Sequence, residues 1–326
     1  SYFGIGAAAG VVVNDNLVDI VITPGAAVGD PTTASWRPQS SAYTVENLVS
    51  TADADSGFDV TITEQGGILT VTGTIPLGAE PVVQTYQVPD PAAWARILFI
   101  EALERAGVTV TADPRTPSSS ELPPVADLDG AIPVATFTSP PFSETARLIN
   151  KVSHNLGANQ LPLLLAAQAG ERTLDAGLAR QMSVLEAAGL GPDDVVITDG
   201  QGLPGNRITP AAMTSYLVSL TDAPYFETFL ESTPILGVDG SLATVLPDGD
   251  PAIGSAHAKT GTLVGPGTDT PYVLETKALA GYLDAASGRR LAFAVFVNDV
   301  PITEVQAVIQ ANTDLGAIAS QLFQLY

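Results

Sequence analysis

Two short polar runs carry the side chains in this chain that could do chemistry. One is Lys259-Thr260-Gly261, which opens an apolar strand pattern, and the other is Ser153-His154-Asn155, about a hundred residues earlier. The lysine ammonium and the threonine hydroxyl are suited to holding a terminal carboxylate, and the glycine lets an extended peptide lie against the strand edge. The serine can relay a proton to a leaving amine, and the asparagine amide can hold a backbone carbonyl. We therefore expect the two runs to line one cleft that grips the end of a peptide.

The nucleophile that would complete such a site is not in the sequence. In acyl transfer with these two runs, the attacking serine stands three residues before a lysine that serves as its base. None of the three lysines, Lys151, Lys259 and Lys277, has a serine three positions before it. The sequence therefore indicates a chemistry whose attacking atom it does not contain.

Other kinds of site have weaker support. The two histidines, His154 and His257, each adjoin one of the runs, but no Gly-x-Ser-x-Gly elbow is present to expose a serine for a Ser-His-Asp hydrolase. Two separated histidines make a poor zinc site, and the acidic loops 53–55 and 248–250 lack the EF-hand pattern, so we interpret them as solvated turns. Trp36 and Trp94 are interpreted as packing residues. We expect no metal and no cofactor.

Composition narrows the class of protein further. The 326 residues carry 13 Lys and Arg against 35 Asp and Glu, a formal net charge of −22, and such a field repels phosphate backbones, so no nucleic-acid partner is expected. The absence of cysteine excludes disulfides and thiol nucleophiles. No apolar run approaches the ~18 residues that span a bilayer, and no basic leader is visible, so we expect no transmembrane segment and no signal peptide in this sequence.

The first part of the chain has the pattern of β structure followed by one helix. We expect an antiparallel, Thr-rich module with a hairpin at Gly66-Gly67 and strands over 17–22, 58–63, 68–75 and near 82–88. Asp90-Pro91 predicts a helix start and Gly107 its end, and 108–110 is predicted to be a short strand. The Pro-, Ser- and acid-rich stretch from Asp113 to Leu128 is the expected linker.

The second part has the pattern of helices followed by strands and a last helix. The predicted helices cover 142–152, 161–167, 174–188, 210–220 and 314–325. Strands are predicted from Lys259 onward and over 278–283 and 291–297, with a turn at 286–288 between the last two.

Taken together, these motifs resemble the D-alanyl-D-alanine carboxypeptidase/endopeptidase branch of the low-molecular-mass class C penicillin-binding proteins. Over roughly residues 85–326, the segments that carry the resemblance are 151–159, 199–203, 207–210, 234–242 and 258–263. Gln201 stands where many members have Ser, and His154 where Asn or Asp is common. The resemblance implies an α+β penicillin-binding/β-lactamase-like transpeptidase fold, with an antiparallel sheet flanked by helices and an inserted β-rich accessory domain. We assign 1–125 to the accessory region, with one helix, and 126–326 to the C-terminal part of the penicillin-binding domain.

The resemblance also implies a function and site residues. The protein is expected to cleave D-Ala-D-Ala peptides of peptidoglycan through an acyl-enzyme, to be acylated by β-lactams, and to be secreted, periplasmic or associated with the cell envelope. The implied catalytic residues are Ser153, Asn155 and Lys259, and the implied substrate-binding residues are Thr260, Gly261 and Thr262.

Three explanations of the missing Ser-x-x-Lys stay open. The chain is a fragment of a longer enzyme, the segment resides in a separate polypeptide, or the protein has lost catalysis. As this fragment alone, it is expected to be inactive. The alternatives to the peptidase are a non-catalytic scaffold that binds cell-wall peptide and an esterase on the same fold.

Overall fold

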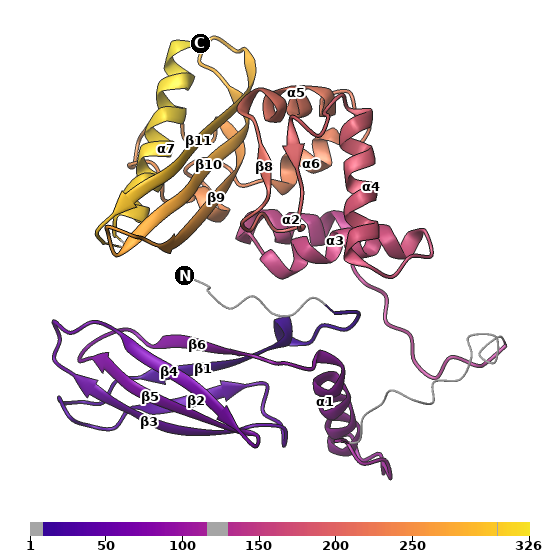
Figure 1. Ribbon diagram of the computed structural model, residues 1–326, viewed down its shortest axis with the longest axis vertical. Coiled ribbons are helices and arrows are strands. Elements are labelled where there is room, and N and C mark those ends of the chain that lie inside the picture. Colours follow the sequence, from indigo (N-terminus) through magenta and orange to yellow (C-terminus); the bar gives the residue numbers. More distant parts are fainter. Residues whose placement is uncertain (1–8, 116–129, 305) are drawn as a thin grey trace. The chain divides into compact units, whose positions relative to one another are not determined.

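The computed structural model describes residues 9–115, 130–304 and 306–326, which belong to two units divided between Ala135 and Thr136 (Figure 1). Most of the expected linker from Asp113 to Leu128 lies outside the described residues, and so does the expected boundary at 125/126. Among the described residues, no helix is long and apolar enough to cross a membrane.

The first unit consists of two three-stranded sheets and one helix. Its elements are η1 (Asn14–Asn16), β1 (Leu17–Thr23), β2 (Thr33–Arg37), β3 (Thr44–Ala52), β4 (Asp59–Gln65), β5 (Ile68–Pro76), β6 (Val82–Gln87) and α1 (Pro91–Arg105). One sheet has the order β2-β1-β6 and the other β3-β5-β4. Apolar residues of β1, β5 and α1 share one buried cluster, so the two sheets and the helix enclose a common core. The Asp90 carboxylate caps α1 by accepting the Ala93 N–H at 3.0 Å, as expected for its start.

Two predictions for this unit were wrong, and the strands β2 and β3 were not predicted. The module is not wholly antiparallel, because β3 runs parallel to β5, whereas the hairpin of β4 and β5 is antiparallel as expected. The side chains of β2 and of the first half of β3 alternate between exposed and partly buried positions, and both strands include several Ser, Thr or Asn residues, so their apolar signal is weak. Residues 108–110 follow α1 without pairing into a strand.

The second unit is an antiparallel sheet flanked by helices. Its elements are α2 (Phe142–Val152), α3 (Asn155–Gln168), α4 (Leu174–Ala187), β7 (Val195–Val196), β8 (Arg207–Ile208), α5 (Pro210–Leu220), α6 (Phe226–Ser232), η3 (Gly240–Leu242), β9 (Ala256–Pro266), β10 (Tyr272–Asp284), β11 (Arg290–Ile302) and α7 (Gln306–Leu325). The sheet has the order β11-β10-β9, with α7 along one face and α5 against the other (Figure 1).

Side chains that alternate along the strands build a core on each face of this sheet. Leu279 and Leu283 of β10 pack with Leu315 of α7, and Tyr282 of β10 packs with Leu217 of α5. Most predicted elements are present here, but α3 begins at Asn155 and α7 at Gln306, earlier than expected, and α6 was missed. The early start of α3 follows from His154, whose ring Nδ1 accepts the Gly157 N–H at 3.1 Å and so caps the helix.

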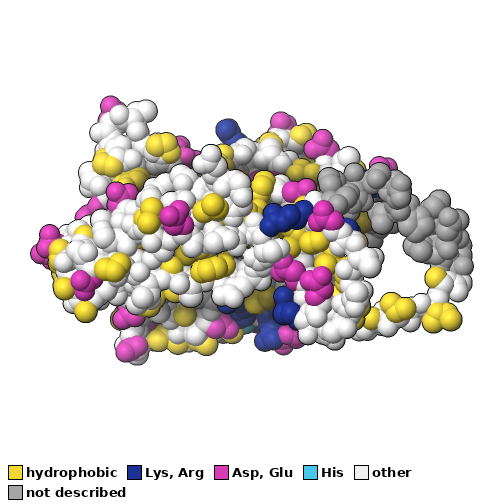
Figure 2. Space-filling model, turned by 90° about the horizontal axis from the view of Figure 1, so that it is seen from below, with side chains coloured by type: hydrophobic (Ala, Val, Ile, Leu, Met, Phe, Trp, Pro, Cys, Tyr) yellow, Lys and Arg dark blue, Asp and Glu magenta, His cyan; other side chains and the backbone are white. Residues whose placement is uncertain are grey.

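Acidic side chains are spread over one face of the molecule. On the face shown in Figure 2, Asp and Glu side chains are scattered over the surface, and they do not gather in one patch. On this face, such a distribution gives a general negative field.

One glycine sets how closely β9 and β10 pair. A Cβ on Gly281 would lie 2.1 Å from the His257 carbonyl oxygen and 2.5 Å from the Ala258 Cα, both in the backbone of β9. A Cβ on Gly261, in contrast, would meet only the Ala278 Cβ at 3.5 Å, which is an ordinary contact.

We expect Gly281→Ala to lower the free energy of unfolding by about 2 to 4 kcal/mol, and Gly261→Ala to change it by less than about 1 kcal/mol. Urea unfolding of both variants tests this, and equal effects would contradict the packing argument.

Candidate active site

The serine of the Ser-x-Asn run lies at the junction of two helices. Ser153 ends α2 in the left-handed conformation, with φ 57° and ψ 52°, and α3 begins two residues later at Asn155. A left-handed residue reverses the chain direction sharply, and for a residue with a Cβ it is strained. The junction therefore holds an exposed Ser153 side chain at the end of α2, next to the first turn of α3.

The lysine of the Lys-Thr-Gly run reaches this junction from the sheet. Lys259 lies on β9, and its Nζ donates to the Ser153 Oγ at 2.7 Å and to the Thr260 carbonyl oxygen at 2.7 Å. The two motifs expected to meet are thus in contact, although 106 positions separate them in the chain.

The environment of Lys259 changes its acidity. Burial, and to a smaller extent the nearby charge of Lys277, lower the pKa of the Lys259 ammonium to about 8. A charged ammonium can only donate, so the Ser153 hydroxyl accepts from it and directs its own proton elsewhere. With a pKa near 8, the same amine can also lose its proton without a large free-energy cost. The pair is therefore suited to passing a proton to or from a bound group.

A short loop holds the threonine of the same run. The Thr260 hydroxyl hydrogen-bonds the Ser241 hydroxyl at 2.8 Å, and Ser241 lies in the single turn η3. Just before it, the Asp239 carboxylate accepts from the Lys151 ammonium at 2.7 Å and from the Ile235 N–H at 2.8 Å. This loop therefore ties β9 to the end of α2.

The loop also packs closely against α2. Gly240 has φ +59°, and a Cβ there would lie 2.6 Å from the Lys151 carbonyl oxygen. Only glycine fits both the backbone angle and the close approach. The Lys151–Asp239 ion pair and this contact together fix the last turn of α2, from which Ser153 projects.

The remaining predicted residues lie along the same edge. β9 is an edge strand, and beyond the single bridge between Ile235 and His257, no strand of the described chain pairs with its outer side. Thr262 is exposed on this strand and accepts a hydrogen bond from the Lys277 ammonium at 2.5 Å. Asn155 makes no side-chain hydrogen bond among the described residues, so its amide is available to a ligand.

The Asp-Gly-Gln-Gly stretch packs against α3. The Asp199 carboxylate accepts backbone N–H groups of Gln201 and Gly202 at 2.8 and 2.7 Å, and the Gly200 N–H donates to the Asn159 side chain at 3.0 Å. A Cβ on Gly200 would lie 2.5 Å from the Ala158 carbonyl oxygen. This loop therefore acts on α3 through the backbone.

Both histidine side chains form hydrogen bonds with backbone groups. The Nδ1 of His154 caps α3, and the Nδ1–H of His257 donates to the Leu230 carbonyl oxygen at 2.9 Å. Among the described residues, no group of three or more His, Cys, Asp and Glu side chains is arranged to hold a metal ion.

Sequence reasoning assigned no role to two residues that the structure brings to the site, Ser241 and Lys277. Ser241 belongs to a segment that carried the family resemblance, but its contact with Thr260 depends on the folded loop. Lys277 did have a local signal, because a lysine within the apolar strand pattern at 272–284 is unexpected.

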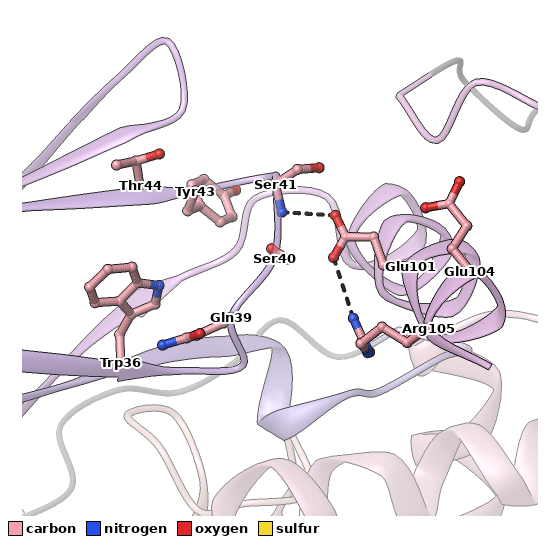
Figure 3. A pocket seen from close by; sticks show the side chains of 9 residues that line it. All are labelled: Trp36, Gln39, Ser40, Ser41, Tyr43, Thr44, Glu101, Glu104 and Arg105. Atoms are coloured by element: carbon pink, nitrogen blue, oxygen red, sulfur yellow. Dashed lines mark hydrogen bonds and ion pairs between the residues drawn. The ribbon is translucent and has the colours of Figure 1, made fainter. Parts of the chain in front are cut away.

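A separate groove of about 620 Å³ lies in the first unit (Figure 3). Trp36 and Tyr43 line it from the strand side, and Glu101 of α1 accepts the Ser41 N–H at 2.8 Å. Trp94 is 1% exposed and packs in the core as expected, whereas Trp36 is half-buried and borders both the core and this groove.

The chain is similar to known proteins in sequence. The D-Ala-D-Ala carboxypeptidase 3 (S13) family matches residues 3–320. The chain is 33% identical over 291 residues to the D-alanyl-D-alanine carboxypeptidase of Actinomadura sp. (strain R39), a match that covers 86% of the chain and 51% of that protein. It is 24% identical over 238 residues to DacB of Haemophilus influenzae, covering 70% and 45%. The chain thus spans about half the length of these curated relatives.

Solved structures show the same fold. Penicillin binding protein 4 (dacB) from Haemophilus influenzae superposes with a TM-score of 0.71 at 20% identity, over 96% of this chain and 67% of that one. A complex of that protein with a β-lactam gives a TM-score of 0.69 over 94% and 70%. The α+β penicillin-binding fold expected from the sequence is confirmed.

The strain at Ser153 can be measured with two variants. Ser153→Ala and Ser153→Gly both remove the hydroxyl that Lys259 contacts, but only glycine adopts a left-handed conformation without cost. We expect Ser153→Gly to be more stable than Ser153→Ala by about 1 kcal/mol in urea unfolding. A more stable alanine variant would show that the left-handed junction carries no strain.

Stability is also expected to rise with pH between about 7.5 and 9.5. Lys259 and Lys277 have pKa values of about 8 in the folded protein, against about 10.4 for an unfolded lysine. The penalty for burying their charge is therefore present below pH 8 and relieved as the pH rises, by about 1 kcal/mol for each lysine. The window ends where Tyr43 and Tyr282 begin to act oppositely, since their pKa values are raised to about 12.

Urea unfolding followed by far-UV circular dichroism at pH 7.5 and 9.5 measures this rise. Tryptophan fluorescence is unsuitable because both tryptophans, Trp36 and Trp94, lie in the first unit. In Lys277→Met, the increase in the free energy of unfolding between pH 7.5 and 9.5 is expected to be at most half of the increase in the wild type. An unchanged rise would contradict the assigned charge penalty.

Proposed function

Because the chain belongs to the S13 family of D-Ala-D-Ala carboxypeptidases, we propose that it forms the peptide-gripping part of a serine-type D-Ala-D-Ala carboxypeptidase/endopeptidase. Its substrates are D-Ala-terminated stem peptides and D-Ala-containing cross-links of peptidoglycan, and it acts outside the cytoplasm, in the periplasm, in the cell envelope or as a secreted protein. The observation that carries the proposal is the 2.7 Å hydrogen bond between the Lys259 Nζ and the Ser153 Oγ, at the open edge of β9.

Each site residue has a role that follows from its chemistry. Lys259, Thr260 and Thr262 hold the terminal carboxylate, since together they offer an ammonium and two hydroxyl donors along one strand edge. Gly261 leaves room for an extended peptide beside β9 because it has no Cβ. Asn155 donates its amide to a backbone carbonyl of the peptide.

The bond changes require a nucleophile from outside these residues. A serine of a Ser-x-x-Lys segment attacks the carbonyl carbon of the penultimate D-Ala, its proton passes to its lysine, and the C–N bond to the last D-Ala breaks. Ser153 hands a proton to the leaving amine and regains one from Lys259, and the proton that the lysine of the Ser-x-x-Lys segment has taken up then restores the charge of Lys259. Water then attacks the acyl-enzyme ester and restores the serine. A β-lactam acylates the same serine, but the ester that it leaves is hydrolysed slowly. Covalent labelling by a β-lactam therefore shows whether the site is assembled.

A non-catalytic peptide-binding role is the second candidate, and a specific observation favours it. The chain itself contains no Ser-x-x-Lys, while the carboxylate-holding residues and their supports are in place. Such a protein would bind a D-Ala-D-Ala peptide without cleaving it.

A fluorescent penicillin separates the two candidates. The product of the complete reading frame that encodes this chain is expected to retain the label on a denaturing gel, and residues 1–326 alone are not. In the complete product, Lys259→Met is expected to slow labelling about 100-fold, because it removes a charged hydrogen-bond donor from the site. Arg180→Met is the matched control, since this exposed residue of α4 makes no polar side-chain contact among the described residues.

Reversible penicillin binding without covalent labelling of the complete product would favour the peptide-binding role. Equal labelling rates for Lys259→Met and Arg180→Met would contradict the assigned role of Lys259.

A further inference from the structure

Lys277 is a charged side chain buried in the middle strand of the sheet. It lies on β10 and is 2% exposed. Buried lysines are almost always paired with an acidic group, because moving an unpaired ammonium out of water is costly. In the described chain, however, its one polar contact is the Thr262 hydroxyl on β9, with the Nζ to Oγ1 distance at 2.5 Å.

The surroundings of Lys277 do not neutralise its charge. It borders a cavity of about 610 Å³ between α7 and the ends of β10 and β11. Glu304 and Asp314 line the same cavity, yet neither carboxylate lies within 4.0 Å of the ammonium among the described residues. Its own charge acts on another cation, because it helps to lower the pKa of Lys259. Burial lowers the pKa of Lys277 to about 8, so at pH 7 the side chain still carries its charge in most molecules.

The hydrogen bond to Thr262 has a fixed direction. An ammonium has no acceptor, so the Thr262 hydroxyl must accept from Lys277. Its own proton then points away, and no acceptor for it is present among the described residues. Thr262 is exposed on the open edge of β9. Lys277 therefore makes Thr262 an outward-facing, charge-polarised donor.

The strand register places these groups on one face of the sheet. Lys277 pairs with Thr262 and Leu279 with Thr260, and residues paired across antiparallel strands share a face. Lys259 pairs with Ala280 and belongs to the opposite face. An anion at the edge of β9 is thus approached by Lys259 from one face and by the two threonine hydroxyls, with Lys277 behind them, from the other.

We propose that Lys277 is a positioning and specificity-determining residue, which acts through Thr262 to favour peptides that end in a free carboxylate over peptides whose C-terminus is amide-linked. The proposal rests on the proposed function, in which Thr262 contacts the terminal group. A bound carboxylate stabilises a cation that has no acidic partner more than a neutral amide does, because the carboxylate supplies the missing counter-charge. Lys277 accordingly shifts the balance toward trimming of free stem ends and away from cross-link cleavage.

Binding to residues 1–326 tests this without any need for turnover. The probes are diacetyl-L-Lys-D-Ala-D-Ala and the same tripeptide with a C-terminal amide, and the quantity measured is the ratio of their dissociation constants. Lys277→Met removes the charge and the donor, Lys277→Gln keeps a donor without the charge, and Arg180→Met again controls for net charge. Thermal unfolding of each variant confirms that it is folded.

In the wild type, the carboxylate peptide is expected to bind at least about tenfold more tightly than the amide. Both Lys277 variants should lower this ratio about fivefold through weaker carboxylate binding, with the amide little changed. Arg180→Met should leave the ratio unchanged. If Lys277→Gln keeps the wild-type ratio, the charge of Lys277 does not set specificity and the proposal is overturned.

The three lysines allow a direct check on the unmutated chain. Selective 13Cε labelling of lysine gives signals for Lys151, Lys259 and Lys277 only, each assignable from its methionine variant. The carboxylate peptide should shift the Lys277 signal and raise the pKa measured for it, whereas the amide should not. An unmoved Lys277 signal beside a shifted Lys259 signal would overturn this inference alone. If neither peptide binds, or if Lys259→Met binds both as the wild type does, the proposed function fails as well.

Discussion

The hydrogen bond between the Lys259 ammonium and the Ser153 hydroxyl is the feature around which the second unit is organised. Each partner sits at a place where the backbone has little freedom. Ser153 is held in a left-handed junction between two helices, and Lys259 lies on a strand whose spacing to β10 is set by Gly281. Since a charge-assisted hydrogen bond depends steeply on distance, small shifts of either element would separate the pair. The supporting parts of the unit oppose such shifts.

Those supports combine side-chain contacts with close backbone packing. The loop that carries Asp239 and Ser241 links the end of α2 to β9, and the loop that carries Asp199 fixes α3 through Asn159. At positions 200 and 240 the backbone lies so close to a neighbouring carbonyl oxygen that a Cβ would stand only 2.5 and 2.6 Å from it, so glycine alone fits there. Short motifs rich in Asp and Gly thus bring helices and a strand into register, while the side chains that face a ligand come from elsewhere.

The charge at this site is opposite in sign to the net charge of the whole protein. The chain has a formal net charge of −22, yet Lys259 and Lys277 lie close enough for one to lower the pKa of the other, and Lys277 has no acidic partner in the described chain. A small cationic spot within a negative field selects for ligands whose negative charge is confined to one end. A peptide terminus meets that condition, and a polyanion does not.

Local patterns in the sequence were enough to identify the family, most helices of the second unit and the two polar runs, because capping residues, helical periodicity and short motifs depend only on neighbouring residues. They predicted β4 and β5 from their hairpin, but they could not show that β3 pairs parallel to β5, since that pairing joins segments with no turn between them. They also could not reveal the contact of Ser241 with Thr260 or of Lys277 with Thr262. Those contacts form only when a loop and a neighbouring strand are laid beside β9, so the hydroxyls and the second cation that stand behind the predicted site became visible only in the folded chain.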